Sequence, residues 1–118
     1  GTFANPIAVA SGNTGVATIT DSAASIFSGA VTLNSHDLRL SPAASALTLS
    51  GGVTSTGTGN LTLNSTGAGV ITLSTASVNN TGTITNSGAG AAANVISAVI
   101  GANVTGVVQN SATSALTL

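Results

Sequence analysis

Three ionisable side chains stand close together in the sequence, at His36, Asp37 and Arg39. A histidine beside a carboxylate can support general acid–base catalysis, with the imidazole as the base and the carboxylate as its orienting partner. Adjacent residues of an extended strand project to opposite faces, so His36 would share a face with Leu38 and Leu40. Asp37 and Arg39 would project together from the other face. We therefore predict an exposed Asp37–Arg39 ion pair of small energetic value instead of a catalytic site.

Other residue patterns that support chemistry are missing from the chain. It has no cysteine, one histidine and two acidic residues, which make a poor ligand set for a metal ion. Serines are plentiful, but no G-x-S-x-G sequence occurs and no second histidine could complete a triad. The glycine pairs within 57–59 and 88–90 have no lysine nearby to bind a phosphate. We predict no enzyme activity, no catalytic or metal-binding residues and no cofactor.

The composition limits the class of protein and its partners. The 118 residues are 42% hydrophobic but only 3% charged, against about a quarter in ordinary soluble domains. A net charge of -1 gives no field that would attract nucleic acid, so we expect no nucleic-acid partner. The hydrophobic content argues against disorder. Abundant Thr, Val, Ile, Gly and Asn, with no Glu, Lys or Met, favour strands and turns over helices.

Residues 88–108 form an uncharged stretch about as long as a bilayer-spanning helix. Polar residues interrupt the stretch, among them Asn94 and Asn103, and its alanines and glycines supply little transfer free energy. We therefore expect no membrane insertion.

Three phrases recur in one order at intervals of 20 to 25 residues. The first is Leu47-Thr48-Leu49-Ser50, which returns as Ile71-Thr72-Leu73-Ser74, as Ile96-Ser97 and as Leu116-Thr117-Leu118. The second is Thr56-Gly57, Thr81-Gly82 and Thr105-Gly106, and the third is Asn64-Ser65, Asn86-Ser87 and Asn110-Ser111. Three markers that keep one order over three copies indicate a structural repeat.

Within each copy, apolar residues alternate with small polar ones, which is the period of a strand with one buried face. The runs are short, and the first copy contains three of them, near 47–50, 53–56 and 60–64. A coil of three short strands per turn accounts for this pattern, because each strand pairs with its equivalent one turn away. The sequence therefore predicts an all-β fold, a parallel β-helix (β-solenoid) of four to five turns, with Leu49 stacked on Leu73.

The second and third markers are expected at the corners of the coil. Gly57, Gly82 and Gly106 can adopt a positive φ without steric cost, and Asn is the next best residue for a left-handed backbone. Equivalent Asn side chains in successive turns would form an amide ladder.

We predict one domain, a single β-solenoid segment over residues 1–118. Residues 1–45 are expected to form irregular early turns, with 41–45 as an extra loop, and residues 46–118 to form regular repeats of about 24 residues.

Residues 93–118, ANVISAVIGANVTGVVQNSATSALTL, resemble the autotransporter-associated β-strand repeat, and residues 45–51, SALTLSG, are similar to the end of that repeat. The resemblance covers about half of the chain. It departs at residues 107–110, where the family often carries a lysine. The resemblance implies a right-handed parallel β-helix in a large secreted surface protein of bacteria, and thus an extracellular or cell-surface location.

The middle residues of the Leu-Thr-Leu phrases must point outward if their neighbours point inward. They are Thr32, Thr48, Thr62, Thr72 and Thr117. A rank of such threonines on one face would suit ice or a polysaccharide, although Thr is also a soluble β-branched residue that is comfortable in any strand.

A structural module is our leading hypothesis: a segment of a bacterial surface fibre, stalk or adhesin passenger. Residues 114–118 repeat the phrase at 45–49 and are expected to begin a further turn. We expect copies of the chain or neighbouring repeats to stack head to tail. The alternative is an ice- or glycan-binding β-solenoid, with a surface glycan as a possible partner. A functional amyloid of in-register layers is a third hypothesis.

Overall fold

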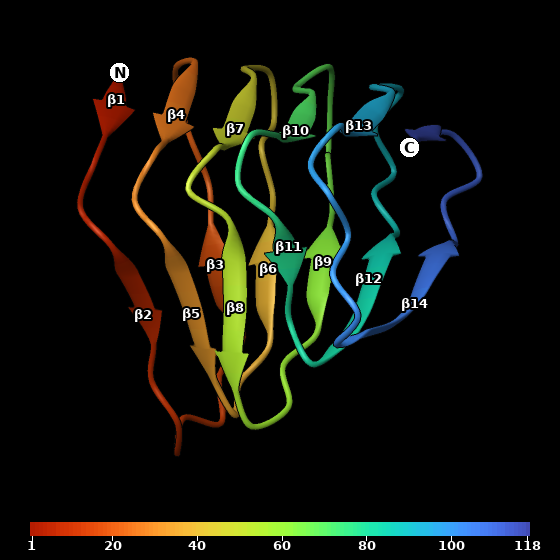
Figure 1. The fold of residues 1–118 in the computed structure, drawn as a ribbon. Helices are drawn as coiled ribbons and strands as arrows, with labels where there is room; N and C mark the ends of the chain where they lie inside the picture. The colour runs from red at the N-terminus through yellow and green to blue at the C-terminus, as the bar shows by residue number, and fades with distance from the viewer.

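The computed structural model describes all 118 residues, which form a coil of short parallel strands without any helix. The chain visits three sheets, A, B and C, in that order in every turn, and it completes about five turns. Figure 1 shows the turns side by side, from β1 at one end to β15 at the other. The predicted all-β parallel β-helix with about three strands per turn is confirmed.

Each sheet collects equivalent strands from successive turns. In stacking order, sheet A contains β1 (Thr2–Phe3), β4 (Ser25–Phe27), β7 (Leu47–Leu49), β10 (Ile71–Leu73), β13 (Asn94–Ile96) and β15 (Leu116–Thr117). Sheet B contains β2 (Ile7–Val9), β5 (Val31–Asn34), β8 (Val53–Thr56) and β11 (Val78–Asn79), and an isolated bridge joins Val78 to Ile100. Sheet C contains β3 (Ala17–Ile19), β6 (Leu38–Leu40), β9 (Leu61–Leu63), β12 (Gly82–Asn86) and β14 (Val104–Gln109).

The register between turns stacks like residues on one another. Leu47 pairs with Ile71 and Leu49 pairs with Leu73, both in parallel between β7 and β10. The predicted stacking of Leu49 on Leu73 is therefore confirmed. The predicted runs near 47–50, 53–56 and 60–64 correspond to β7, β8 and β9.

The inward residues of all three sheets form one apolar column. Sixteen buried residues make up this cluster: Val9, Val31, Leu33, Leu38, Leu40, Leu47, Leu49, Val53, Leu61, Leu63, Ile71, Leu73, Val78, Ile84, Ile96 and Ala98. Burying one Leu or Ile side chain stabilises a fold by roughly 1.5–3 kcal/mol, whereas ordering one residue of backbone costs roughly 1–2 kcal/mol. A lone turn has too few such residues to fold, so the turns stabilise one another through the shared column.

Only one of the corner markers behaves as predicted. Gly57 has a φ of +76°, which is the left-handed conformation that glycine adopts without strain. Gly82, at +158°, is close to extended, and Gly106 lies inside β14 without a positive φ. The non-glycine residues with positive φ are Ser35 and Thr75, and neither is an asparagine, so the prediction of left-handed Asn corners is wrong.

Close contact between turns explains other corner glycines better than backbone conformation does. A Cβ atom added at Gly51 would collide with the carbonyl oxygen of Gly29, one turn away. At Gly88 it would collide with the carbonyl oxygen of Ser65. The backbones of successive turns lie against each other at these corners, and any side chain would push them apart.

The first turns use the same three sheets as the later ones. Ile19 pairs with Leu40, and Leu40 pairs with Leu63, so sheet C continues through residues 1–45. The predicted extra loop at 41–45 is the corner between β6 and β7, and a corner of similar length follows both β9 and β12. This loop is therefore an ordinary part of the repeat, which its proline and alanines disguise in the sequence.

Residues 88–108 contain β13 and all of β14 except its last residue, Gln109. No helix in the structure is long and apolar enough to span a bilayer.

Candidate functional site

Arg39 is the centre of β6 and points outward from sheet C, because Leu38 and Leu40 on either side are buried in the column. Its register partners are Thr18 in β3 and Thr62 in β9. The Nε atom of Arg39 is shielded from solvent and has no hydrogen-bond partner within the chain.

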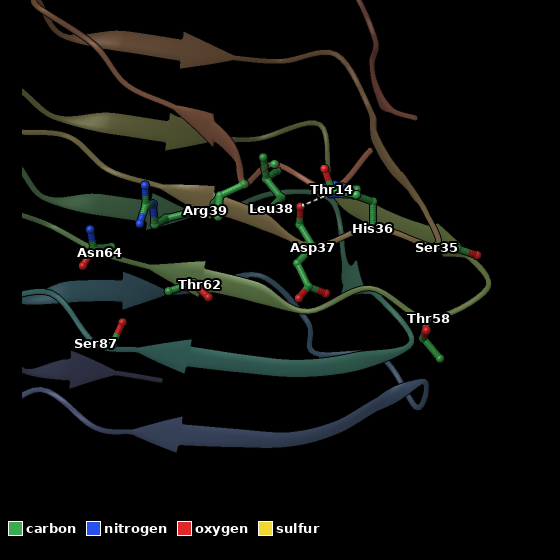
Figure 2. Close-up of a pocket in the computed structure, with 12 residues that line it drawn as sticks. Thr14, Ser35, His36, Asp37, Leu38, Arg39, Thr58, Thr62, Asn64 and Ser87 are labelled. Atoms are coloured by element: carbon green, nitrogen blue, oxygen red, sulfur yellow. Dashed lines mark hydrogen bonds between the residues drawn. The ribbon is translucent and has the colours of Figure 1, made fainter. Parts of the chain in front are cut away.

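The predicted Asp37–Arg39 ion pair does not form. A carboxylate oxygen of Asp37 accepts a hydrogen bond of 2.8 Å from the backbone N–H of Asn60 in the next turn. Figure 2 shows the side chains of Asp37 and Arg39 extending in different directions. Strand alternation fails here because β6 begins only at Leu38, so Asp37 belongs to the corner that precedes the strand.

His36 also lies in this corner and is partly exposed, so it does not share the buried face of Leu38 as predicted. Its Nδ1 atom donates to the backbone carbonyl of Asp37 at 2.7 Å. Because a carbonyl oxygen only accepts, Nδ1 carries the proton in this contact. His36 therefore contacts the main chain of Asp37, and the carboxylate of Asp37 is engaged elsewhere.

An open groove runs along sheet C beside these residues (Figure 2). Its lining is mostly hydroxyl, amide and backbone groups: Thr14, Gly15, Val16, Ser35, His36, Asp37, Leu38, Arg39, Thr58, Thr62, Asn64 and Ser87. His36, Asp37 and Arg39, the neighbouring ionisable residues of the sequence, all line this groove, and Arg39 is its one permanently charged donor. No group of three or more His, Cys, Asp or Glu side chains lies together anywhere in the chain.

The remaining acidic residue, Asp21, lies in the corner between β3 and β4. Both of its carboxylate oxygens are shielded from solvent and have no hydrogen-bond partner. Desolvation by this burial raises the pKa of Asp21 above its ordinary value of 3.8, and the nearby backbone N–H of Asp21 itself and the α-amino group of Gly1 oppose the shift only in part. Phe3 and Phe27 stack nearby, with ring centroids 5.1 Å apart, and line the same hollow.

The outward threonines are divided among the three faces. Thr48 and Thr72 pair directly in sheet A, and Thr117 continues their column beyond Val95. Thr32 belongs to sheet B and Thr62 to sheet C. The predicted ranks exist, but each face has its own, and apolar or charged residues interrupt those of sheets A and C.

A buried polar network is the principal feature that sequence reasoning missed. It joins four side chains with no more than 1% exposure, Ser65, Asn86, Asn94 and Ser114, at the corner between sheets C and A. Asn86 pairs in register with Leu63, and the residue that stacks on Ile71 is Asn94. Two amides therefore occupy interior positions that hold Leu and Ile in the preceding turn.

Every amide group of the network is hydrogen-bonded. Asn94 donates to Oδ1 of Asn86 at 2.9 Å, and its own Oδ1 accepts from the backbone N–H of Ile71 at 2.8 Å. Asn86 donates to Oε1 of Gln109 and to the carbonyl of Ser114, both at 2.8 Å. The hydroxyl of Ser114 donates to the carbonyl of Ala92 at 2.6 Å. Buried amides are tolerated when satisfied in this way.

The network changes the alignment of the repeats. Ile96 pairs with Leu73, and Leu116 pairs with Asn94, so the equivalent of Ile71 is Asn94 and the predicted match to Ile96 is wrong by two residues. The middle copy of the third marker, Asn86-Ser87, is also shifted by one residue. Asn64 and Asn110 of the other two copies align with Ser87 and not with Asn86. The predicted ladder of equivalent Asn side chains is replaced by the Asn86–Gln109 pair. In the sequence, this shift is indicated only by the unequal spacing between the copies of the first marker.

No protein-family model, curated protein or solved structure matches the chain.

Proposed function

We propose that the chain is a structural module that extends and stiffens a bacterial surface fibre, stalk or adhesin passenger. The observation that carries the proposal is the continuous apolar column, in which sixteen buried residues from three sheets stack turn upon turn. Such a column can be lengthened by further turns without a change of design, because each turn contacts only its neighbours. The exterior supports the same role, since its polar groups are mainly hydroxyls and amides.

The resemblance to the autotransporter-associated β-strand repeat supports a place in a secreted surface protein. The two SALTL phrases, at 45–49 and 114–118, both lead from a corner into sheet A, through β7 and β15. A phrase that occupies one structural position in two turns behaves as a genuine repeat unit. An extracellular location at the cell surface follows from this resemblance as part of the proposal.

The partners in this role are neighbouring repeats or copies of the chain, stacked head to tail. Parallel strands of successive turns already pair in all three sheets, so the same pairing can join one coil to the next. Each joined copy would continue the apolar column.

Electron microscopy and fibre diffraction of the purified chain test this role. We expect rods in which strands lie across the long axis, with a layer spacing of about 4.8 Å and, for five layers, a subunit repeat of roughly 24 Å. The subunit repeat separates stacked coils from an amyloid, in which every layer is a separate chain. Discrete particles at all concentrations would contradict end-to-end stacking of this chain.

A second candidate is an ice- or glycan-binding surface on sheet A, which the direct pairing of Thr48 with Thr72 favours. It ranks second because Ile26 and Val95 stand in the same column and remove two hydroxyls from it. Thermal hysteresis, together with retention on insoluble polysaccharide, measures this activity. Loss of either activity in a Thr48→Val, Thr72→Val double variant would assign it to these hydroxyls.

A further inference from the structure

The outer face of sheet A is the longest face of the coil and carries no ionisable side chain. Its six strands lie side by side along the whole coil (Figure 1). Arg39 lies on sheet C, His36 and Asp37 lie in the corner before it, and the carboxylate of Asp21 is shielded in another corner. The α-amino group of Gly1 donates to the carbonyl of Ala24 at the first turn. Over the later turns, a second surface could approach sheet A without any charged side chain having to lose its hydration.

One column of β-branched side chains runs along the middle of this face. The register places six residues in it: Thr2, Ile26, Thr48, Thr72, Val95 and Thr117. Every member carries a branched Cβ, whereas only four carry a hydroxyl, so the shared property is the shape. The column forms a ridge, and Ile26 is 43% exposed on it.

Smaller side chains flank the ridge on both sides. The register of the sheet aligns Ala24, Ala46, Val70, Ala93 and Ala115 on the side where each strand begins. The backbone hydrogen bonds of the sheet align Ser28, Ser50, Ser74 and Ser97 on the side where each strand ends. The face therefore consists of a branched ridge between a mostly alanine groove and a serine margin.

We propose that this face packs against the same face of a second copy of the chain, about a two-fold axis parallel to the coil. In this arrangement the ridge of each copy lies over the alanine groove of the other, and both serine columns fall at the edge. One two-fold rotation places each ridge in the groove of the other copy, so both copies use the same surface, as in an isologous contact. An apolar centre with a polar rim is the usual anatomy of such an interface.

The area of the face agrees with a reversible pair. Six strands at about 4.8 Å spacing and three side-chain columns cover roughly 500 Å² per copy, or roughly 1,000 Å² in the pair. This total lies at the lower limit for specific interfaces, so we expect dimers that dissociate on dilution. The pairing deepens the proposed structural role, because it would bundle neighbouring rods laterally.

Analytical ultracentrifugation of the chain, from micromolar to millimolar concentrations, tests the pairing with two matched variants. Thr72→Lys places a charge on the ridge of sheet A, between Thr48 and Val95. Thr85→Lys places the same charge on sheet C, between Thr62 and Val108. Both positions are partly exposed, so the two variants differ chiefly in the face that they alter.

We expect the wild-type chain and Thr85→Lys to form a dimer, and Thr72→Lys to raise the dissociation constant at least tenfold while its circular dichroism stays unchanged. A monomeric wild type, or equal effects of both variants, overturns the pairing. If the wild type stays monomeric and Thr72→Lys abolishes retention on ice or polysaccharide, the face has that other occupant. Thr72 lies in the middle of the coil, so head-to-tail stacking is measured independently and can survive the loss of the dimer.

Discussion

Two successive turns of the coil fill the same interior corner with different kinds of side chain, apolar in one turn and amide in the next. Where sheet C leads into sheet A, one turn buries Leu63 and Ile71, and the next buries Asn86 and Asn94 at the equivalent positions. Sheet pairing between these turns continues in register across the change. The fold therefore requires that side chains fill the corner and that every buried polar group there is hydrogen-bonded. Both apolar side chains and paired amides meet this requirement.

The two solutions differ in how strongly they fix the position of the chain. Apolar contacts are non-directional, so Leu63 and Ile71 tolerate small shifts between turns. The hydrogen bond from Asn94 to Asn86 is directional, and displacement by a few tenths of an ångström or rotation of either amide weakens it. The amide corner also ties Ser65 of one turn to Ser114 two turns later through Asn94. We infer that the polar corner specifies the register of the last turns more strictly than the apolar corner specifies that of the earlier ones.

The largest effect is expected from moving an amide into the apolar part of the column. Leu49→Asn places an amide between Phe27 and Leu73, where neither side chain can accept or donate a hydrogen bond. The lost burial and the unpaired amide together predict a loss of roughly 4–6 kcal/mol in the free energy of unfolding. Urea denaturation followed by circular dichroism measures it.

Leu49→Met is the matched control, because it keeps the volume and apolar character of the side chain and is expected to cost less than about 1.5 kcal/mol. Similar losses of unfolding free energy in Leu49→Asn and Leu49→Met would contradict the contrast between the two corners, because the apolar turns would then tolerate an amide.

The converse change removes an amide from the polar corner. Asn94→Ala leaves the backbone N–H of Ile71 and the Oδ1 atom of Asn86 without their present partners. Each unpaired buried group costs about 1–3 kcal/mol, and water that enters the space recovers part of it, so we expect a loss of roughly 2–3 kcal/mol. Val95→Thr changes the adjacent outward residue and is expected to stay within about 0.5 kcal/mol.

A double-mutant cycle with Asn86→Ala sharpens this result. If the two amides act as one unit, the double variant will lose less than the sum of the single losses, with a coupling of roughly 0.5–3 kcal/mol. Strict additivity would mean that each amide is satisfied separately and that the corner is not a network.

The difference between the two corners also explains what could be predicted from the sequence. The alternation of Leu47 and Leu49 with polar residues, and its return at Ile71 and Leu73, was sufficient for the strands, the coil and the stacking, because apolar burial has a simple period. The same reasoning assigned Ile96 to the position that Asn94 occupies. A rule that places apolar residues inside has no means of placing a buried amide.

The position of Asn94 depends on partners that are distant in the sequence. Its oxygen bonds to the backbone of Ile71, 23 residues away, and to the hydroxyl of Ser65, 29 residues away. No local pattern encodes these contacts. The prediction of an Asp37–Arg39 ion pair is wrong for a related reason. Asp37 accepts a hydrogen bond from Asn60 of the next turn, and strand alternation cannot predict a contact made from a corner.

The smallest effect is expected at Asp21, which extends the comparison to the other end of the coil. Asp21 follows Ile19 by two residues as Ser65 follows Leu63, and the register aligns these corners. Ser65 is hydrogen-bonded to Asn94, whereas the carboxylate oxygens of Asp21 have no partner. Burial of that carboxylate raises its pKa in the folded state above 3.8.

The sign of the pH dependence follows from this shift. Below pH 3.8 the carboxyl group is neutral in both the folded and the unfolded chain, so its burial carries no charge penalty. As the pH rises through the raised pKa, the folded chain must bury a charge, and its stability falls to a lower plateau. Asp21→Asn removes the charge, so we expect it to raise the melting temperature slightly at neutral pH and to leave it nearly unchanged below pH 3.8. Asp37→Asn alters the net charge equally and keeps an acceptor for Asn60, so a gain confined to the Asp21 variant would locate the effect in the unsatisfied corner.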